Sequence, residues 1–371
     1  MASQQRVRDD RLIVCEVEKR GTEASGNGEV AVLNPLEGSC WDEAIGVVGG
    51  GGFFHGSRWA LVLQESYGYR PYYICCEQGG RTTGLLPLME VDSWVTGRRG
   101  VSLPFTDECQ PLAVNSASFQ LLLQKALARG NEHRWKYLEL RGGREFLPEE
   151  QASQRFYGHV VDLTPGEEKL FASLRPSVRR AIRKAKGRGL EVEISQELEA
   201  VQQFYALQCK TRRKHGLPPQ PFQFFRKLHE HILSKGCGIV VLARLGAKIV
   251  AANVYLHKGQ EALYKFGASE PAYQEMRGND LVMWEGIKYY AWKGFRSLHL
   301  GRTSVANEGL RRFKLGWGAR EGSIEYFRYD LRLQGFVTGR DEAFGWYNRF
   351  FSVLPLGLSR LFGGLLYRHV G

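Results

Sequence analysis

The sequence predicts an α/β (α+β) protein made of two similar domains, each a mixed central sheet flanked by helices. The chain has 371 residues, which exceeds the usual size of one domain, so two domains of roughly 150 residues are expected. In the second half, strand-like and helical segments follow one another in the order β-α-α-β-β-β-α-β-α-β. This order is typical of a mixed sheet covered on both faces. The first half follows a vaguer version of it, without a detectable repeat.

The first half is predicted to run from a helix through several strands to a second helix. Trp59, Leu63 and Tyr67 have helical spacing in the segment 57–68. The next two apolar runs are joined by a glycine pair at 79–80, which indicates a hairpin turn. The predicted elements are strands at 70–78 and 82–91, an extended stretch at 100–114, a helix at 116–130 stopped by Gly130, and a strand at 135–142.

The second half opens with a predicted capping box, "TPGE", in which the Thr164 side chain accepts a hydrogen bond from the backbone of Glu167. A short helix to Leu174 follows. The segment 175–189 then forms an apolar stripe at helical spacing and carries seven cations with no acid among them. Beyond it we predict strands in "LEVEI", "CGIVVLARLG", "KIVAANVYLHKG", "QEALYKFGAS", "FRSLHLG" and "SIEYFRYDL", and helices in "ELEAVQQFYALQCKTRRKHG", "PFQFFRKLHEHILSKG", "NDLVMWEGIKYYAWKG" and "VANEGLRRFKLG".

Charge and cysteine content narrow the class of protein. The net charge of +12 favours an anionic partner, which can be a nucleic acid, a phosphorylated small molecule or a lipid surface. Seven cysteines without a C-x-x-C pair argue against a disulfide framework and a zinc ribbon, and the histidines lack the spacing of metal ligands. The histidine spacing predicts no bound metal. The absence of an apolar leader and of long apolar runs predicts a cytoplasmic protein, either free or peripheral at the inner membrane surface.

Four segments together, "SVRRAIRKAKGRGLEV", "YKFGAS", "LVMWEGIKYYAWKGF" and "GLRRFKLGWG", resemble the FemABX family within the GNAT acyltransferases. The resemblance covers roughly residues 40–330. It implies tandem GNAT domains and a peptidyltransferase that uses aminoacyl-tRNA to extend peptidoglycan precursors. We therefore expect a disordered start at 1–11, a degenerate first GNAT-like domain at 12–160, a catalytic second domain at 161–330, and an apolar and basic tail at 331–371.

The predicted function is an acyl- or aminoacyltransferase that forms an amide on a cell-envelope precursor, in peptidoglycan or an exopolysaccharide. No cofactor is expected to stay bound, and aminoacyl-tRNA or acyl-CoA would be the co-substrate. The expected partners are an anionic or lipid-linked precursor and tRNA, but not DNA. Two alternatives stay open: an acyl-CoA-dependent N-acyltransferase acting on an amino sugar, and a non-catalytic anion-binding scaffold.

The resemblance also implies roles for single residues. Lys314, which follows Phe313, matches a lysine in the family's catalytic region, where a fixed cation stabilises an oxyanion. Tyr264 matches a tyrosine that contacts substrate, and Asp107 aligns with an aspartate that orients or deprotonates the acceptor amine. The alternatives are a lysine stem covering Trp317, an ordinary strand aromatic and a turn residue.

Two further sets of cations are candidates for binding anions. Arg212, or its neighbour Arg213, lies where the family binds phosphate, a role that suits the planar guanidinium. Arg179 and Arg183, in the cationic helix, are predicted to contact tRNA or a diphosphate. The alternative for all four is a solvated helix face or a helix end favoured by the helix dipole.

The sequence departs from the family and from CoA-dependent GNATs at several points. Gln64 replaces a phosphate-binding lysine of the first domain, which argues against a nucleotide-linked acceptor. "EMRGND" at 275–280 keeps only Gly278 of the loop that binds the pyrophosphate of CoA, and "VVGGGGFFHGS" lacks the spacing of a phosphate loop and is predicted to be a turn. The apolar tail from Phe344 to Val370 is expected either to pack on the first domain or to lie on an anionic membrane.

Overall fold

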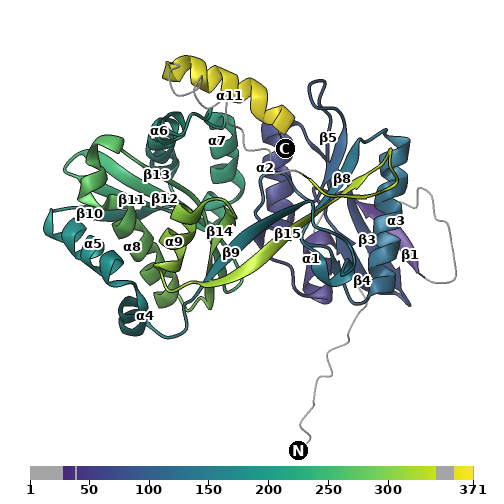
Figure 1. Ribbon diagram of the computed structural model, residues 1–371, viewed down its shortest axis with the longest axis horizontal. Helices are drawn as coiled ribbons and strands as arrows, with labels where there is room; N and C mark the ends of the chain where they lie inside the picture. The colour runs from purple at the N-terminus through teal and green to yellow at the C-terminus, as the bar shows by residue number, and fades with distance from the viewer. Residues whose placement is uncertain (1–27, 38–39, 340–354, 371) are drawn as a thin grey trace, which may run out of the picture.

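A computed structural model describes residues 28–37, 40–339 and 355–370 of the chain. They form two α/β domains side by side, with one helix lying across both (Figure 1). The elements of the first domain are β1 (Glu29–Leu33), α1 (Cys40–Val48), η1 (Phe53–His55), α2 (Ser57–Tyr67), β2 (Arg70–Pro71), β3 (Tyr73–Gln78), β4 (Arg81–Leu86), β5 (Met89–Val91), β6 (Arg99–Val101), β7 (Leu112–Ala113), α3 (Ser116–Glu132), β8 (Tyr137–Arg141) and η2 (Arg144–Phe146).

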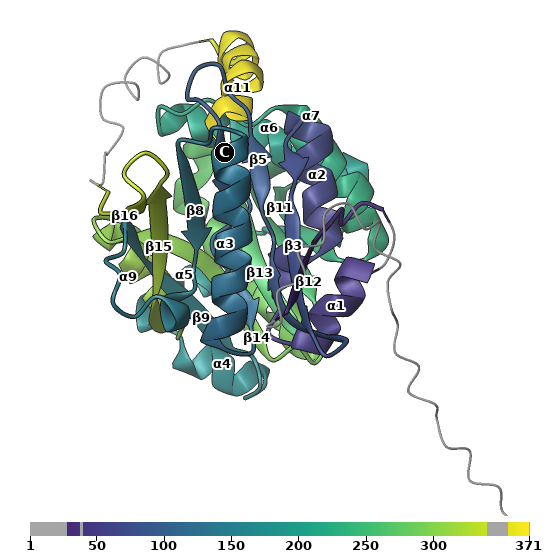
Figure 2. The ribbon, with the colours of Figure 1, turned by 90° about the vertical axis from the view of Figure 1, so that its right-hand side faces the viewer.

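Helices cover both faces of the small sheet β1-β3-β4-β7 in the first domain. Successive residues of a strand point to opposite faces. Tyr73 of β3 therefore packs in the core that includes α1, whereas Ile74 packs in the core that includes α3. The Asn115 side chain caps α3 by accepting a hydrogen bond from the backbone of Ser118, at 2.8 Å. Figure 2 shows α3 lying along one face of this domain.

The second domain contains the strand and helix order predicted from the sequence. Its elements are β9 (Gln154–Asp162), α4 (Glu167–Ser173), α5 (Pro176–Gly187), β10 (Glu191–Ser195), α6 (Leu198–Lys214), α7 (Phe222–His231), η3 (Leu233–Lys235), β11 (Gly238–Leu245), β12 (Lys248–Lys258), β13 (Glu261–Ser269), η4 (Pro271–Met276), α8 (Gly278–Trp292), β14 (Ser297–Ser304), α9 (Glu308–Leu315), β15 (Arg320–Asp330) and β16 (Gly335–Val337). Helices α4, α5 and α8 pack on one face of the sheet, and α6 and α7 pack on the other.

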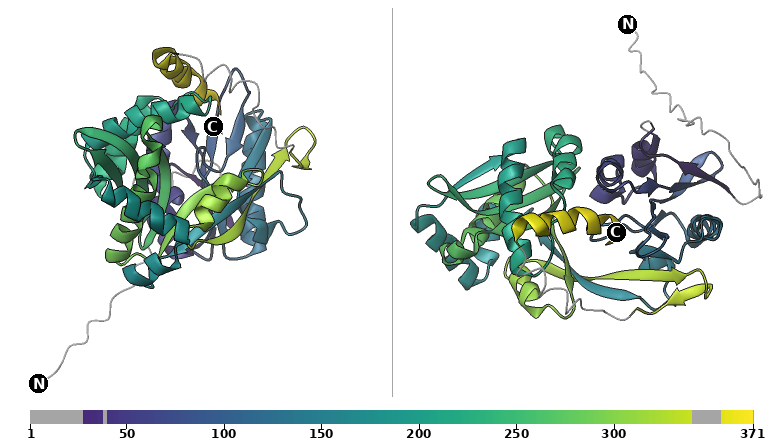
Figure 3. Two further views of the ribbon diagram at one scale, coloured as in Figure 1. Left: turned by 60° about the vertical axis from the view of Figure 1, so that its left-hand side comes forward. Right: turned by 90° about the horizontal axis from the view of Figure 1, so that it is seen from above.

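Two long strands, β9 and β15, connect the domains. They pair with each other over seven residue positions, from Arg320↔Val160 to Tyr326↔Gln154. At one end β9 pairs with β14 of the second domain, and at the other β15 pairs with β8 of the first. A single 12-stranded sheet thus runs through the molecule. The view from above shows the two long strands crossing from one domain to the other (Figure 3). The domain boundary predicted at 160–161 lies inside β9.

Several local predictions were wrong. Thr164 forms no capping box: its backbone and hydroxyl donate to the Asp162 carboxylate, and Gly166 occupies the cap position of α4. Gly130 does not stop α3, which continues to Glu132. At Gly130 an added Cβ would collide with Leu331, so close packing explains this glycine. The prediction also omitted β1, α1 and β9.

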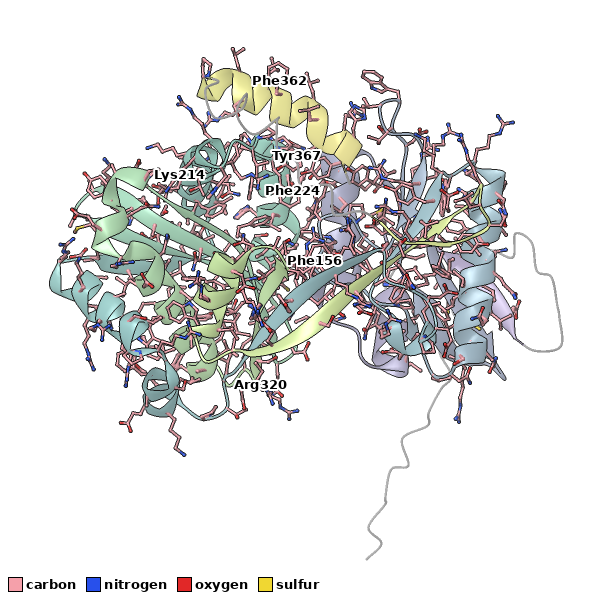
Figure 4. All side chains as sticks on the ribbon, viewed as in Figure 1. Phe156, Lys214, Phe224, Arg320, Phe362 and Tyr367 are labelled. Atoms are coloured by element: carbon pink, nitrogen blue, oxygen red, sulfur yellow. The ribbon has the colours of Figure 1, made fainter. Side chains whose placement is uncertain are left out.

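The tail helix α11 (Leu356–Val370) packs on both domains rather than on the first alone. Near its C-terminal end, the His369 carbonyl accepts from Thr96 and Arg99 of the first domain, each at 2.9 Å. Arg360 donates to the Cys209 sulfur of α6, in the second domain. Figure 4 shows Tyr367 where α11 meets the two domains.

In the described part of the chain, no helix is long and apolar enough to cross a membrane. The predicted disordered start, 1–11, lies outside the described residues.

Candidate functional site

The most irregular part of the large sheet lies where β13 and β14 diverge. These strands are parallel neighbours, but they pair only between residues 261–263 and 297–299. Just beyond, a register shift between β12 and β13 pairs Tyr255 with Tyr264 and Val254 with Phe266, which leaves Lys265 unpaired in a β-bulge. A second shift, between His299 and Arg302, interrupts the pairing of β14 with β9. Both shifts turn side chains toward the first domain.

Lys265 at the bulge forms a buried contact with the first domain. Its ammonium donates to the Phe105 carbonyl at 2.7 Å and lies 3.4 Å from the Asp107 carboxylate. It also lies 4.8 Å from the centre of the Phe54 ring, within cation–π range. Leu103 and Phe105 both have a φ of +59°, which is strained for residues with a side chain. A strained loop of the first domain therefore presents Asp107 to the second domain.

Asp107 is held in its ionised form. Burial acts to raise the pKa of its carboxyl, but Lys265, His299 and Arg302 together lower it to about 2. The carboxylate also accepts from the Arg302 backbone N–H, at 3.3 Å. A group with this pKa is a poor proton acceptor at neutral pH, so the chemistry open to Asp107 is to orient cations.

Lys314, from α9, reaches the same place from the other side of β14. Its ammonium donates to the carbonyls of Gly301 and Arg302, at 2.8 and 2.9 Å, and the residue is 3% exposed. Burial lowers its pKa to about 8, although the Asp107 carboxylate acts to raise it. The alternative of a surface lysine does not hold, and the catalytic role of Lys314 stays a prediction. Asn307 caps α9 by accepting from the Leu310 backbone at 3.0 Å, which helps to fix this helix.

Arg302 and Tyr326 complete the charged cluster. The Arg302 guanidinium donates to the Tyr326 hydroxyl at 2.7 Å, and that hydroxyl donates to the Asp107 backbone carbonyl at 2.6 Å. Arg302 also lies 4.3 Å from the centre of the Phe156 ring, which Figure 4 shows between the domains. Strands β9, β14 and β15 thus contribute side chains that hold the Asp107 loop in place.

One cavity, of about 300 Å³, opens on the second domain beside the diverging part of β13. We call it the β13–α8 cavity. Tyr264 lines it, and burial raises the pKa of this tyrosine to about 12, so its hydroxyl stays protonated. The N-terminal end of α8, formed by the "EMRGND" segment, borders it through Asn279, and Lys214 and Phe313 also line it. Helix N-termini favour anionic groups, so this end of the cavity suits a phosphate.

A second cavity, of about 290 Å³, lies between the domains beside the paired part of β13 and β14. We call it the interdomain cavity. The predicted turn "VVGGGGFFHGS" borders it through Gly50, Gly52 and η1. Its polar lining comes from both domains: His55, Asp107, Glu108 and Gln110 from the first, and Glu261, Ser297 and His299 from the second. The two cavities therefore use successive segments of β13: residues 261–263 line the interdomain cavity, and Tyr264 with residues 267–269 lines the β13–α8 cavity.

The arginines predicted to bind phosphate do not line either cavity. Arg212 donates to the Tyr367 hydroxyl at 2.5 Å and to the Pro218 carbonyl, so it fastens α11 to the second domain. Arg213 is its neighbour in α6, near the Lys214 rim of the β13–α8 cavity. Arg179 and Arg183 lie on the surface of α5, where Arg183 stacks over the Phe171 ring at 5.5 Å. Their roles in binding stay predictions.

Sequence reasoning missed Lys265, Arg302, Tyr326, Glu108 and His299. Lys265 stands next to Tyr264 in a segment already singled out, but nothing in the segment marks a bulge.

One possible metal-binding cluster occurs among the described residues, at Glu65, Glu230 and His231. The Lys227 ammonium already contacts both of its carboxylates, at 2.5 and 2.8 Å, so the chain itself compensates part of the negative charge.

Comparison with known proteins identifies the fold. Residues 172–328 match the acetyltransferase (GNAT) domain family. No curated protein sequence is close enough to count as a relative. Among solved structures, FemX is similar with a TM-score of 0.64 at 13% identity, covering 79% of this chain and 96% of FemX.

Two other solved structures resemble the chain over most of its length. A tandem GNAT protein from the clavulanic acid biosynthesis pathway has a TM-score of 0.52 at 10% identity, over 82% of this chain and 98% of that protein. L-PGS from Bacillus licheniformis has a TM-score of 0.52 at 13% identity, over 81% and 98%. At these identities the similarity concerns the fold. The predicted fold class, with tandem GNAT-like domains, is confirmed.

Proposed function

We propose that the chain is an acyltransferase of the GNAT superfamily, built on a FemX-like tandem fold, and that it transfers an acyl or aminoacyl group to an amine of a cell-envelope precursor. One observation carries the proposal. Two cavities use successive segments of β13, and a buried cluster of charges from both domains adjoins the bulge of this strand. Such a site can hold an activated carbonyl on one side and an amine on the other.

The proposed chemistry is a substitution at an acyl carbon. The acyl donor, an ester or thioester, lies in the β13–α8 cavity with its carbonyl toward the bulge. A neutral amine attacks, a C–N bond forms, and the carbonyl oxygen becomes an oxyanion. Lys314 and Arg302 supply fixed positive charge near that oxygen, in a site that excludes most water. Collapse of the oxyanion then breaks the C–O or C–S bond, and the leaving group takes up a proton.

The donor is proposed to carry phosphate groups. The GNAT family match supports acyl-CoA, whose pyrophosphate would bind at the N-terminal end of α8. The FemX-like fold supports aminoacyl-tRNA instead, and the exposed cations of α5 offer a surface for its backbone. Neither donor stays bound as a cofactor.

The proposed acceptor is a precursor of the cell envelope, in peptidoglycan or an exopolysaccharide, and the FemX-like fold supports this class. A lipid-linked acceptor would place the enzyme at a membrane surface. Leu358, Leu361 and Leu365 on the outer face of α11, and the 88% exposed Trp94 beside its end, are suited to that contact. This placement is part of the proposal.

The test is a transfer assay with the purified full-length chain. Labelled acetyl-CoA and a pool of labelled aminoacyl-tRNAs are offered separately with an extract of envelope precursors, and the products are analysed by mass spectrometry. We expect an amide-linked label from one donor only. A chain with Lys314→Ala serves as the negative control. Loss of both labels to water, with no amide product from any precursor fraction, would overturn the proposal.

A further inference from the structure

The interdomain cavity is lined by two acidic side chains without a partner among the described residues, the exposed Glu261 at its rim and the half-buried Glu108. The Glu108 carboxylate lines the cavity, and no hydrogen bond or ion pair from the described residues holds it. Its neighbour Asp107, by contrast, contacts the Lys265 ammonium and the Arg302 backbone. The pair thus divides into a carboxylate fixed by cations and a carboxylate left facing the cavity.

A half-buried carboxylate without a partner either takes up a proton or pairs with a cation from outside the chain, because an ionised group that leaves water unpaired is costly. The cavity has the shape and lining for an organic cation. Phe53 and Phe54 provide aromatic walls, and Glu261 adds a second acid at the rim. A volume of about 290 Å³ accommodates an alkylammonium group with the first part of its carrier.

We propose that the interdomain cavity receives the acceptor as a primary ammonium, and that Glu108 takes up its proton before the nitrogen attacks the acyl carbon. This inference rests on the proposed function and identifies the acceptor group and the general base. In the step, an N–H bond of the ammonium breaks and an O–H bond forms on Glu108. The neutral amine then forms the C–N bond, and the proton passes from Glu108 to solvent or to the leaving group.

The other titratable groups at the cavity are less suited to take this proton. His299 accepts from the Gly301 backbone at Nδ1, at 2.9 Å, so its neutral ring carries the proton at Nε2 and has no free lone pair for the amine. Burial lowers the pKa of His55 to about 4, and Asp107 has a pKa of about 2. Burial first, and then the charges of Glu145 and Asp107, raise the pKa of Glu108 to about 7. A base is most effective when its pKa lies near the working pH.

Other ionisable groups lie at the cavity or beside it, and among them Glu145 and Asp107 raise the pKa of Glu108. These groups are His55 of η1, Asp107 and Cys109 beside it in the loop, Glu145 of η2, Lys258 of β12, Glu261 of β13 and His299 of β14. Glu145 is exposed and is not part of the cavity lining. Removing its charge should therefore lower the pKa of Glu108 without altering the cavity.

The first experiment measures binding alone, with n-propylammonium as the probe and calorimetry on the full chain. This amine stays protonated below pH 9, so only the protein titrates. If Glu108 must be ionised to bind it and has a pKa near 7, the apparent Kd should rise about tenfold from pH 8 to pH 6. Glu108→Gln should bind the probe more weakly and lose this pH dependence, whereas the exposed control Glu149→Gln should keep both. Equal binding by Glu108→Gln and the wild type would overturn the proposal.

The second experiment uses the transfer assay with two amine probes. Glu108→Gln should reduce transfer to n-propylamine about 100-fold or more, while transfer to methoxyamine, which is already neutral at pH 7, should stay within a few-fold of the wild type. Glu145→Gln should move the acidic limb of the wild-type pH profile to lower pH. Equal losses with both amines would assign Glu108 a structural role and overturn the inference. A wild-type chain that transfers to no amine would instead count against the proposed function, and the binding experiment would still decide whether Glu108 holds the ammonium.

Discussion

The Lys265 ammonium lies 3.4 Å from the Asp107 carboxylate, and this contact joins the bulge of β13 to the strained loop of the first domain. The two residues are separated by 158 positions in the sequence. The Lys265 side chain is 7% exposed and that of Asp107 18%, so water screens the pair only partly. These two charges therefore lie next to each other only when both domains are folded and in contact.

Breaking this pair should destabilise the whole protein. Asp107→Asn leaves the Lys265 ammonium buried without its counter-charge. Loss of one partner from a buried pair typically costs about 3–5 kcal/mol, and we expect the lower end because Asp107 keeps some exposure. Urea unfolding measures the free energy. The double variant Asp107→Asn with Lys265→Met should lose less than the sum of the two single variants, and strict additivity would show that the pair is not coupled.

The same pair predicts how stability depends on acid. The pKa of Asp107 is about 2 in the folded protein and 3.8 in its ordinary state, so the folded state favours the ionised form. The contribution of Asp107 to the free energy of unfolding is complete above its ordinary pKa of 3.8. It is lost as the pH falls through the folded pKa of about 2. The stability difference between wild type and Asp107→Asn should thus be full at pH 6 and should shrink between about pH 4 and pH 2. A difference that stays constant over this range would contradict the assignment.

Lys314→Ala should lower kcat/KM for transfer about 100- to 1,000-fold, equivalent to about 2.7–4 kcal/mol, which is the scale for one lost oxyanion donor. The variant also removes the donor to two backbone carbonyls of β14, so the unfolding free energy must be measured alongside. The matched control is Lys288→Ala, because Lys288 pairs with Glu285 of α8 and Glu167 of α4 and lines neither cavity. Wild-type transfer by Lys314→Ala would leave this lysine a structural role only.

Tyr264 should act on donor binding rather than on the chemical step. Tyr264→Phe removes a protonated hydroxyl from the β13–α8 cavity, so we expect a higher KM for the acyl donor with a smaller change in kcat. Gly267→Ala should reproduce the effect, because a Cβ there would collide with the Tyr264 hydroxyl. Steady-state kinetics with the donor varied measure both. An unchanged KM in both variants would remove this cavity from the donor site.

The cations of α5 should matter only if a polyanion binds there. Reversing Arg179 and Arg183 to Glu should weaken binding of aminoacyl-tRNA and reduce the salt dependence of its Kd. The same reversal of Arg81 and Arg332, exposed cations on other elements, controls for net charge. Filter binding from low to moderate salt gives the salt dependence of the Kd for each double variant. If the two double variants behave alike, α5 has no specific part in binding.

The tail can be tested by truncation after Arg340. Removal of α11 exposes the places where it contacts Tyr69, Arg99 and Arg212, so we expect a lower melting temperature. Membrane contact requires a separate measurement, in which the full chain with Leu361→Glu and Leu365→Glu is compared with wild type by flotation on anionic vesicles. Loss of flotation with unchanged melting temperature would support the membrane. Equal recovery of both proteins in the unbound fraction would leave α11 as a structural clamp.

The sequence by itself determined the order of the elements in the second domain and the importance of a few residues within them. Periodicity reports which residues of a segment face a core, and it predicted α5, α6, α8 and the strands between them. Phe313 and Trp317 drew attention to Lys314, because a lysine close to two aromatic residues is unusual on a solvated helix. The capping box failed because Thr164 has a nearer acceptor in Asp162, a competition between local hydrogen bonds that spacing does not reveal.

Only the tertiary structure decided which charges meet. Lys265 leaves its strand pairing at a bulge, Asp107 reaches it from a strained loop, and Arg302 and Tyr326 join them from strands that cross between the domains. The environment of Glu108 likewise depends on a cavity that neither domain forms alone. The physical reason is that burial and charge pairing act through space, between residues far apart in the chain, whereas sequence patterns record only what neighbouring residues need.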